Sequence, residues 1–118
     1  RLVVDGGHNI SSSYVIADWI KNQTQKVNLV VAMMKDKEHK EFMKSFEGLV
    51  NSITIIDIPN QDGGISKKEL KEKISDLNFT LKISDSIDSA IRSNSKDINA
   101  ITLVCGSLYL IGEVLNSN

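Results

Sequence analysis

Asp5, His8 and Asn9 stand close together in the sequence VVDGGHN, with Gly6 and Gly7 between them. Asp5 can accept hydrogen bonds from ribose hydroxyls or an amine, and His8 can donate to an anion or take up a proton near neutral pH. The two glycines let the backbone turn tightly and leave room for a ligand. A strand-to-helix turn capped by Asn9 would use the same residue types, so this pattern alone leaves both interpretations open.

A second polar stretch, MKDKEH, follows an apolar segment at 27–33. Lys35 and Lys37 could reach a phosphate or a carboxylate, with Asp36 orienting one of them. A helix cap at Asp36 and a solvated first turn is the simpler interpretation of the same residues. His39 lies in a charged helical stretch, where we expect it on the surface.

The third stretch, CGSLYLIGEVL, begins at Cys105, for which the apolar context ITLVCG predicts a buried, inert thiol. Ser107 opens a helix, so its hydroxyl and the free amides of the helix start could hold an anion, or Ser107 could simply be the N-cap. No G-x-S-x-G segment surrounds this serine, as a nucleophile on a strained turn would require. The sequence also lacks a G-x-x-x-x-G-K-[ST] loop, a G-x-G-x-x-G segment and metal-ligand spacing, so no metal residue is assigned.

These residues must be positioned by a fold that alternates strands and helices. We expect strands at 2–5, 27–33, 52–58, 79–83 and 100–105, and helices at 11–21, 38–49, 66–77, 86–93 and 108–115. Several strands are continuous Val/Ile/Leu runs, which is typical of a parallel sheet covered on both faces. The sequence therefore predicts an α/β fold: an open, mostly parallel, Rossmann-like sheet of five to six strands with helices on both faces. Ligands bind such sheets beyond the carboxyl ends of the strands, where all three stretches fall.

Composition restricts the classes of partner. The 118 residues suffice for one domain with a single core, and the net charge of −1 provides no basic field for nucleic acid or an anionic membrane. Cys105 is the only cysteine, which excludes an internal disulfide and favours an intracellular protein. No apolar stretch approaches the length of a membrane span. The chain opens directly on a strand without an initiator Met, so we expect a piece of a longer protein.

A phosphoacceptor receiver domain is one alternative, because it is also a five-stranded α/β unit with acids after the first and third strands. Asp5 and Asp57 could fill those places. A receiver needs an acidic pair after the first strand, however, and here Gly6 follows Asp5. It also needs a lysine after the fifth strand, where this chain has Gly106 and Ser107. We therefore discount it.

The three stretches together resemble the C-terminal domain of folylpolyglutamate synthase/dihydrofolate synthase, a member of the Mur ligase superfamily of ADP-forming amide ligases. That family reads L-D-G-A-H-N-P at its first stretch and T-G-S-L-Y-L-x-G-E at its last, and the likeness runs from about Leu2 to Leu115. The form DGxHN is shared with Mur ligases, whereas GSLYLIGEV points to the folate branch. A Mur-type peptidoglycan precursor ligase and a stand-alone, non-catalytic α/β binding module remain the alternatives.

The resemblance implies one domain, residues 1–118, at the C-terminus of a larger ligase, inactive alone. An upstream P-loop domain of the same polypeptide would supply the Mg²⁺ ligands. ATP would activate a folate or dihydropteroate carboxylate as an acyl phosphate, which L-glutamate then attacks. By position, Asp5 and Asn9 match ATP contacts, His8 matches the catalytic histidine, and His8 and Ser107 match contacts to glutamate or the acyl phosphate. The resemblance further implies a cytoplasmic monomer that binds no nucleic acid and no membrane.

The sequence departs from the family pattern at two positions. Gly7 replaces the usual alanine and Ile10 the usual proline. Proline at a helix start presets the backbone, so its loss leaves the turn less rigid but removes no functional group.

Overall fold

A computed structural model of the chain describes residues 1–116. Strands and helices alternate along the described chain, as the sequence predicts. The strands are β1 (Leu2–Asp5), β2 (Lys26–Val31), β3 (Ser52–Ile55), β4 (Leu81–Ile83) and β5 (Ala100–Cys105). The helices are α1 (Ile10–Lys21), α2 (His39–Lys44), α3 (Lys67–Lys73), α4 (Ile87–Asn94) and α5 (Leu108–Asn116).

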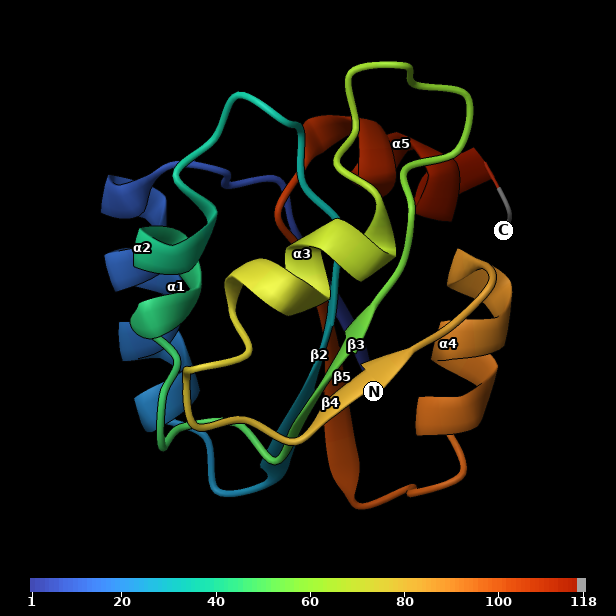
Figure 1. Cartoon of the computed structure of the whole chain (residues 1–118). Coiled ribbons are helices and arrows are strands. Elements are labelled where there is room, and N and C mark those ends of the chain that lie inside the picture. The colour runs from blue at the N-terminus through green and yellow to red at the C-terminus, as the bar shows by residue number, and fades with distance from the viewer. Residues whose placement is uncertain (117–118) are drawn as a thin grey trace.

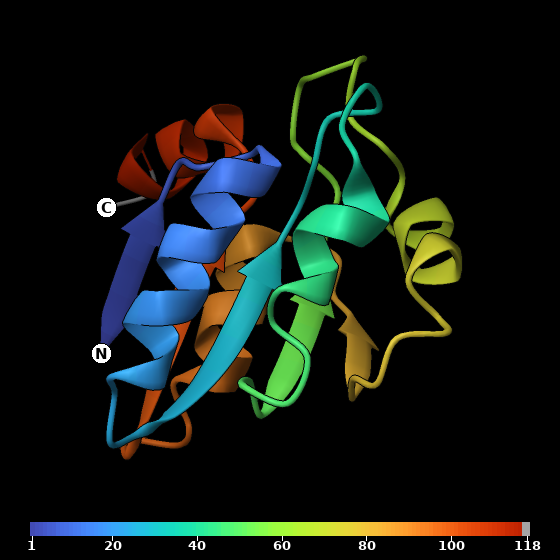
Figure 2. The ribbon, with the colours of Figure 1, turned by 90° about the vertical axis from the view of Figure 1, so that its left-hand side faces the viewer.

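The strands form a single five-stranded sheet in the order β1-β5-β2-β3-β4, and every neighbouring pair is parallel. The predicted sheet is thereby confirmed, with five strands in residues 1–116. All arrows in Figure 2 point the same way, so the carboxyl ends of the strands share one edge of the sheet. We call it the carboxyl edge. Asp5 pairs with Cys105 in the register of β1 and β5, which brings the ends of the first and last strands together there.

Helices cover both faces of the sheet (Figure 1). α1, α2 and α3 pack on one face around buried side chains such as Ile16, Phe42 and Leu70. α4 and α5 pack on the other face through Ala90 and Leu110, among others. Strands β2 and β5 are buried almost throughout, as their continuous apolar sequences predict. The rigid sheet therefore fixes the positions of the loops that leave its carboxyl edge.

Several element bounds differ from those predicted. β2 and β3 end at Val31 and Ile55, earlier than expected, although the next residues stay buried. The loops after them leave the sheet to pair with each other, through an isolated antiparallel bridge between Met34 and Gly64. α2 is shorter than predicted because the chain turns after Lys44, and Gly48 adopts a φ of 76°. α3 likewise ends at Lys73.

His39 is buried, with 4% of its surface exposed, and its prediction as a surface residue is wrong. His39 precedes Phe42, Met43 and Phe46, all buried, at the spacing of one helical face. That spacing places the imidazole against the core in spite of its charged neighbours in sequence. Its Nε2 lies 2.8 Å from the carbonyl oxygen of Met34.

Candidate functional site

The turn after β1 begins with Asp5, which is half-buried at the end of the strand. Its Oδ1 accepts a hydrogen bond from the backbone N–H of Gly7 at 2.8 Å. One carboxylate oxygen thus stabilises the turn itself. Since an ionised carboxylate has two oxygens that can each accept more than one hydrogen bond, Asp5 keeps capacity for a ligand.

His8 is held by its own turn. Its Nδ1 lies 3.3 Å from the carbonyl oxygen of Gly6. Because a carbonyl oxygen can only accept, Nδ1 carries the proton in this contact, and Nε2 of the neutral ring is left as an acceptor. The turn therefore presents a nitrogen that can accept a proton or, once protonated, donate to an anion.

Asn9 is the N-cap of α1. Its Oδ1 accepts from the Ser12 N–H at 2.8 Å, and the Ser12 Oγ accepts from the Asn9 N–H at 3.0 Å, which completes a capping box. The side-chain oxygen of Asn9 is thus engaged in the cap, which leaves its amide nitrogen available to a ligand. The same geometry accounts for Gly7, because a Cβ there would lie 2.6 Å from the Cβ of Ser12.

The turn after β5 carries Gly106 and Ser107. Gly106 has a φ of 108°, and a Cβ at this position would lie 2.5 Å from the backbone oxygen of Ala32. Ser107 is 2% exposed, and its Oγ accepts from the Tyr109 N–H at 3.1 Å, as the cap of α5. The close approach of this turn to the chain beyond β2 sets the position of the α5 N-terminus.

Two adjoining cavities lie at the carboxyl edge, and we call them together the edge cleft. The first, of about 430 Å³, is lined by His8, Met34, Asp36, Lys37, Ser107, Leu108 and Tyr109. The second, of about 310 Å³, is lined by His8, Asn9, Ile10, Asp36, Lys37 and Glu38. His8, Asp36 and Lys37 border both cavities. The fold therefore brings together His8 and Ser107, which the sequence places about a hundred residues apart.

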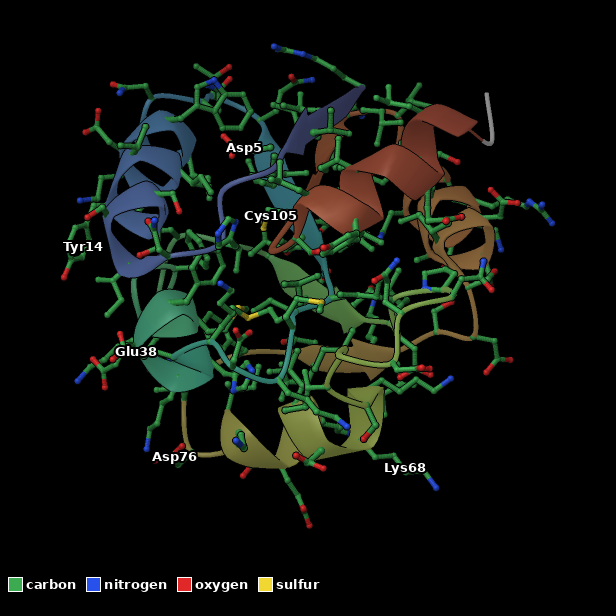
Figure 3. All side chains as sticks on the ribbon, turned by 90° about the horizontal axis from the view of Figure 1, so that it is seen from above. Asp5, Tyr14, Glu38, Lys68, Asp76 and Cys105 are labelled. Atoms are coloured by element: carbon green, nitrogen blue, oxygen red, sulfur yellow. The ribbon has the colours of Figure 1, made fainter. Side chains whose placement is uncertain are left out.

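Other residues of the three stretches lie elsewhere. Asp5 lines neither cavity and lies at the end of β1, beside Cys105 (Figure 3). Lys35 lines a separate cavity with Asp57. Tyr14, on α1, points outward at the rim of this view. Asp57 is engaged at the start of α3, where its Oδ1 accepts from the Lys67 N–H at 2.7 Å.

Sequence reasoning did not separate Lys37 from Lys35, and it missed Leu108 and Tyr109 as cleft residues. Leu108 and Tyr109 are 64% and 52% exposed, so both side chains are open to solvent at the border of the cleft. Their position immediately after Ser107, at the start of a helix on the carboxyl edge, is the signal that could have identified them.

Cys105 is a buried free thiol, as predicted. Burial and, secondarily, the charge of Asp5 raise the pKa of this thiol to about 12. It therefore stays protonated at neutral pH and is not a nucleophile there.

Residues 1–116 contain no group of three or more His, Cys, Asp or Glu side chains arranged to hold a metal ion. None of the helices in this part of the chain has the length and apolarity needed to cross a membrane.

Fold and site together define an open-sheet α/β domain with a polar cleft at the carboxyl ends of its strands. A family model described as dihydrofolate synthetase, C-terminal domain, matches residues 1–117, and the chain belongs to that family. A search of curated proteins gave no match.

Solved structures share the fold at low sequence identity. The E. coli FolC in complex with DHPP and ADP has a TM-score of 0.85 at 21% identity, and the match covers 99% of this chain. A Mycobacterium tuberculosis folylpolyglutamate synthase complexed with ADP and AMPPCP has a TM-score of 0.90 at 12% identity and 98% coverage. The Yersinia pestis bifunctional folylpolyglutamate synthase/dihydrofolate synthase with Mn, AMPPNP and L-glutamate bound has a TM-score of 0.84 at 20% identity and 98% coverage. The chain spans only 28%, 29% and 28% of these three chains, respectively.

Proposed function

We propose that this chain is the C-terminal domain of an ATP-dependent, ADP-forming amide ligase that joins L-glutamate to a folate or dihydropteroate carboxylate. The observation that carries the proposal is the family match over residues 1–117. The edge cleft supports it, because His8 and Ser107, the residues that the resemblance assigns to substrate, both line its larger cavity.

In the proposed reaction the acceptor carboxylate attacks the γ-phosphorus of ATP, which releases ADP and leaves an acyl phosphate. The amino group of glutamate then attacks the acyl carbon. A C–N bond forms, the C–O bond to phosphate breaks, and inorganic phosphate departs. The proton lost from the amine goes to a base, for which Nε2 of His8 is our candidate because the Nδ1 contact to Gly6 leaves it as the acceptor.

The remaining residues of the site have positioning roles in this proposal. Asp5 and Asn9 contact ATP, and Ser107 contacts glutamate or the acyl phosphate at the start of α5. Such groups contribute by placing reactants and by meeting the charge that develops in the transition state. Closure of the domain over the nucleotide would also exclude water, which would otherwise hydrolyse the acyl phosphate.

The rest of the catalytic machinery belongs to an upstream P-loop domain of the same polypeptide, which also supplies the Mg²⁺ ligands. We propose that the isolated domain is inactive and that the whole enzyme is a cytoplasmic monomer. The length of the solved relatives supports the first point, because this chain matches under a third of each of them.

The test is a ligation assay on the full-length protein that contains this chain. Labelled glutamate and ATP are supplied with either dihydropteroate or tetrahydrofolate as acceptor, and the wild type is compared with His8→Asn. Asn at this position can keep a donor to the Gly6 carbonyl while it removes Nε2. We expect glutamate transfer by the wild type and a loss of about 100-fold or more in the variant. Absence of transfer to either acceptor would contradict the proposed function.

A further inference from the structure

The turn between β1 and α1 contains two successive glycines, Gly6 and Gly7. Glycine lacks the Cβ that restricts the backbone of other residues, so contacts must fix the course of this segment. Gly7 is held from within the turn, because its N–H donates to Asp5 Oδ1 at 2.8 Å. Gly6 is held from outside the turn, by a side chain of α5.

Leu108, the first residue of α5, packs directly on Gly6. A Cβ on Gly6 would overlap the Cδ2 methyl group of Leu108, and it would lie 3.4 Å from Leu108 Cγ and 3.9 Å from Cγ1 of Ile111. The space that a side chain of residue 6 would fill is thus occupied by a leucine from the last helix. Since α5 is anchored on the sheet through the buried Leu110, its first residue is a fixed support for the turn.

Leu108 connects the two turns that carry the proposed substrate contacts. It follows Ser107 in the chain, and it packs on Gly6, whose carbonyl oxygen lies 3.3 Å from His8 Nδ1. Leu108, His8 and Ser107 line the same cavity of about 430 Å³. A shift of Gly6 would therefore move the hydrogen-bond partner of Nδ1 and change the direction in which Nε2 of His8 faces the cleft.

The exposure of Leu108 separates this contact from ordinary core packing. The side chain is 64% exposed, so it contributes little to stability by burial, and its truncation should leave the fold intact. Leu115 offers a matched comparison on the same helix. It is also 64% exposed, but it lines neither cavity of the edge cleft.

We propose that Leu108 is a positioning residue for His8. By packing on Gly6 it fixes the peptide group that holds Nδ1, and it thereby directs Nε2 toward the reacting amine. This inference rests on the proposed function, in which Nε2 of His8 takes the proton of the amine. Leu108 acts on the reaction through His8 and not through contact with a substrate.

The first experiment is a double-mutant cycle in the full-length protein that contains this chain. Leu108→Ala and Leu115→Ala are each measured alone and combined with His8→Asn, in the ligation assay described above. We expect Leu108→Ala to lower kcat about 10- to 100-fold and to change the KM for ATP and glutamate less than about twofold, because a misplaced base slows the chemical step without weakening binding. Leu115→Ala should match the wild type. In the His8→Asn background Leu108→Ala should have no further effect, since Nε2 is already absent.

An equal loss of kcat by Leu108→Ala in the wild-type and His8→Asn backgrounds would overturn the inference, because Leu108 would then act independently of His8. A wild-type kcat in Leu108→Ala would overturn it as well, and so would a raised KM with kcat unchanged, since Leu108 would then contact a substrate. A wild type that transfers no glutamate would refute the proposed function itself, and this inference with it. Urea unfolding midpoints of the two Ala variants, expected to agree, show that neither change has disrupted the fold.

A second experiment moves the methyl group from one side of the contact to the other. The backbone at Gly6 has no positive φ, so alanine fits there once space is available. Gly6→Ala alone should lower kcat, because the new Cβ would displace Leu108. The double variant Gly6→Ala/Leu108→Ala should be more active than either single variant, since the alanine methyl group takes the space that the leucine leaves. Losses of kcat that multiply in the double variant would contradict the proposal, because the two residues would then not act through a shared contact.

Discussion

The turns that follow β1 and β5 lie side by side at the carboxyl edge, and both lead directly into a capped helix. The two turns differ in which residues cap the following helix and which face a ligand. In the first turn Asn9 and Ser12 form the cap, so Asp5 and His8 are left to meet a ligand. In the second turn Ser107 is the cap and also lines the cleft, and it is almost completely buried. Substitution of Asp5 or His8 therefore leaves the helix cap of the first turn in place, whereas substitution of Ser107 removes the cap of the second.

The largest expected effect concerns the shape of the second turn. Gly106→Ala should destabilise the chain by about 3 kcal/mol or more, because a positive φ is strained for alanine and the new Cβ would meet the backbone of Ala32. Gly112→Ala is the control within the same region, since a Cβ there has nothing within 4 Å. As a helix-interior glycine, its replacement should stabilise by about 0.5–1 kcal/mol. Urea unfolding followed by Trp19 fluorescence measures the free energy of unfolding of both variants. If Gly106→Ala unfolds with the same free energy as the wild type, the requirement for glycine at this position is refuted.

A smaller effect is expected for the double role of Ser107. Ser107→Ala should cost about 1–2 kcal/mol of stability through the lost cap and the unpaired Tyr109 N–H. It should also lower ligation by the full-length enzyme. Ser107→Thr keeps the hydroxyl and should recover more of the stability than of the activity, because the extra methyl group enters a buried position. If Ser107→Ala carries out ligation at the wild-type rate, Ser107 serves only as the N-cap of α5 and takes no part in the reaction.

The smallest effect concerns Cys105, the partner of Asp5 across the two strands. Because burial raises the pKa of this thiol to about 12, it should not react with a thiol reagent at pH 8 until the chain unfolds. The raised pKa contributes stability that is fully present below the ordinary value of 9.0 and is lost as the pH rises toward 12. Reaction with dithionitrobenzoate, with and without urea, tests this, and rapid labelling of the folded chain would contradict the buried position.

Much of this architecture follows from the sequence, because strand runs, helix starts and the parallel topology are local or near-local properties. The carboxyl ends of parallel strands meet at one edge, so the proximity of His8 and Ser107 could be anticipated. The burial of His39 was also readable from its spacing to Phe42, Met43 and Phe46, but the charges beside it in the sequence suggested otherwise.

The separation of Lys35 from Lys37 could not be predicted in the same way. A loop has no periodicity that assigns alternate residues to different sides. Here the direction of each lysine depends on the pairing of Met34 with Gly64, thirty residues away in the sequence. Such contacts form only once the whole sheet has assembled.

The central claim is that the turn after β1 contributes chemistry and is more than a helix start. Asp5→Asn tests it most directly, because asparagine keeps an oxygen for the Gly7 N–H and removes only the charge. In the full-length enzyme we expect kcat/KM for ligation to fall about 100-fold while the free energy of unfolding changes by less than about 0.5 kcal/mol. Wild-type ligation by Asp5→Asn would contradict the account and leave VVDGGHN as a strand end and a helix cap.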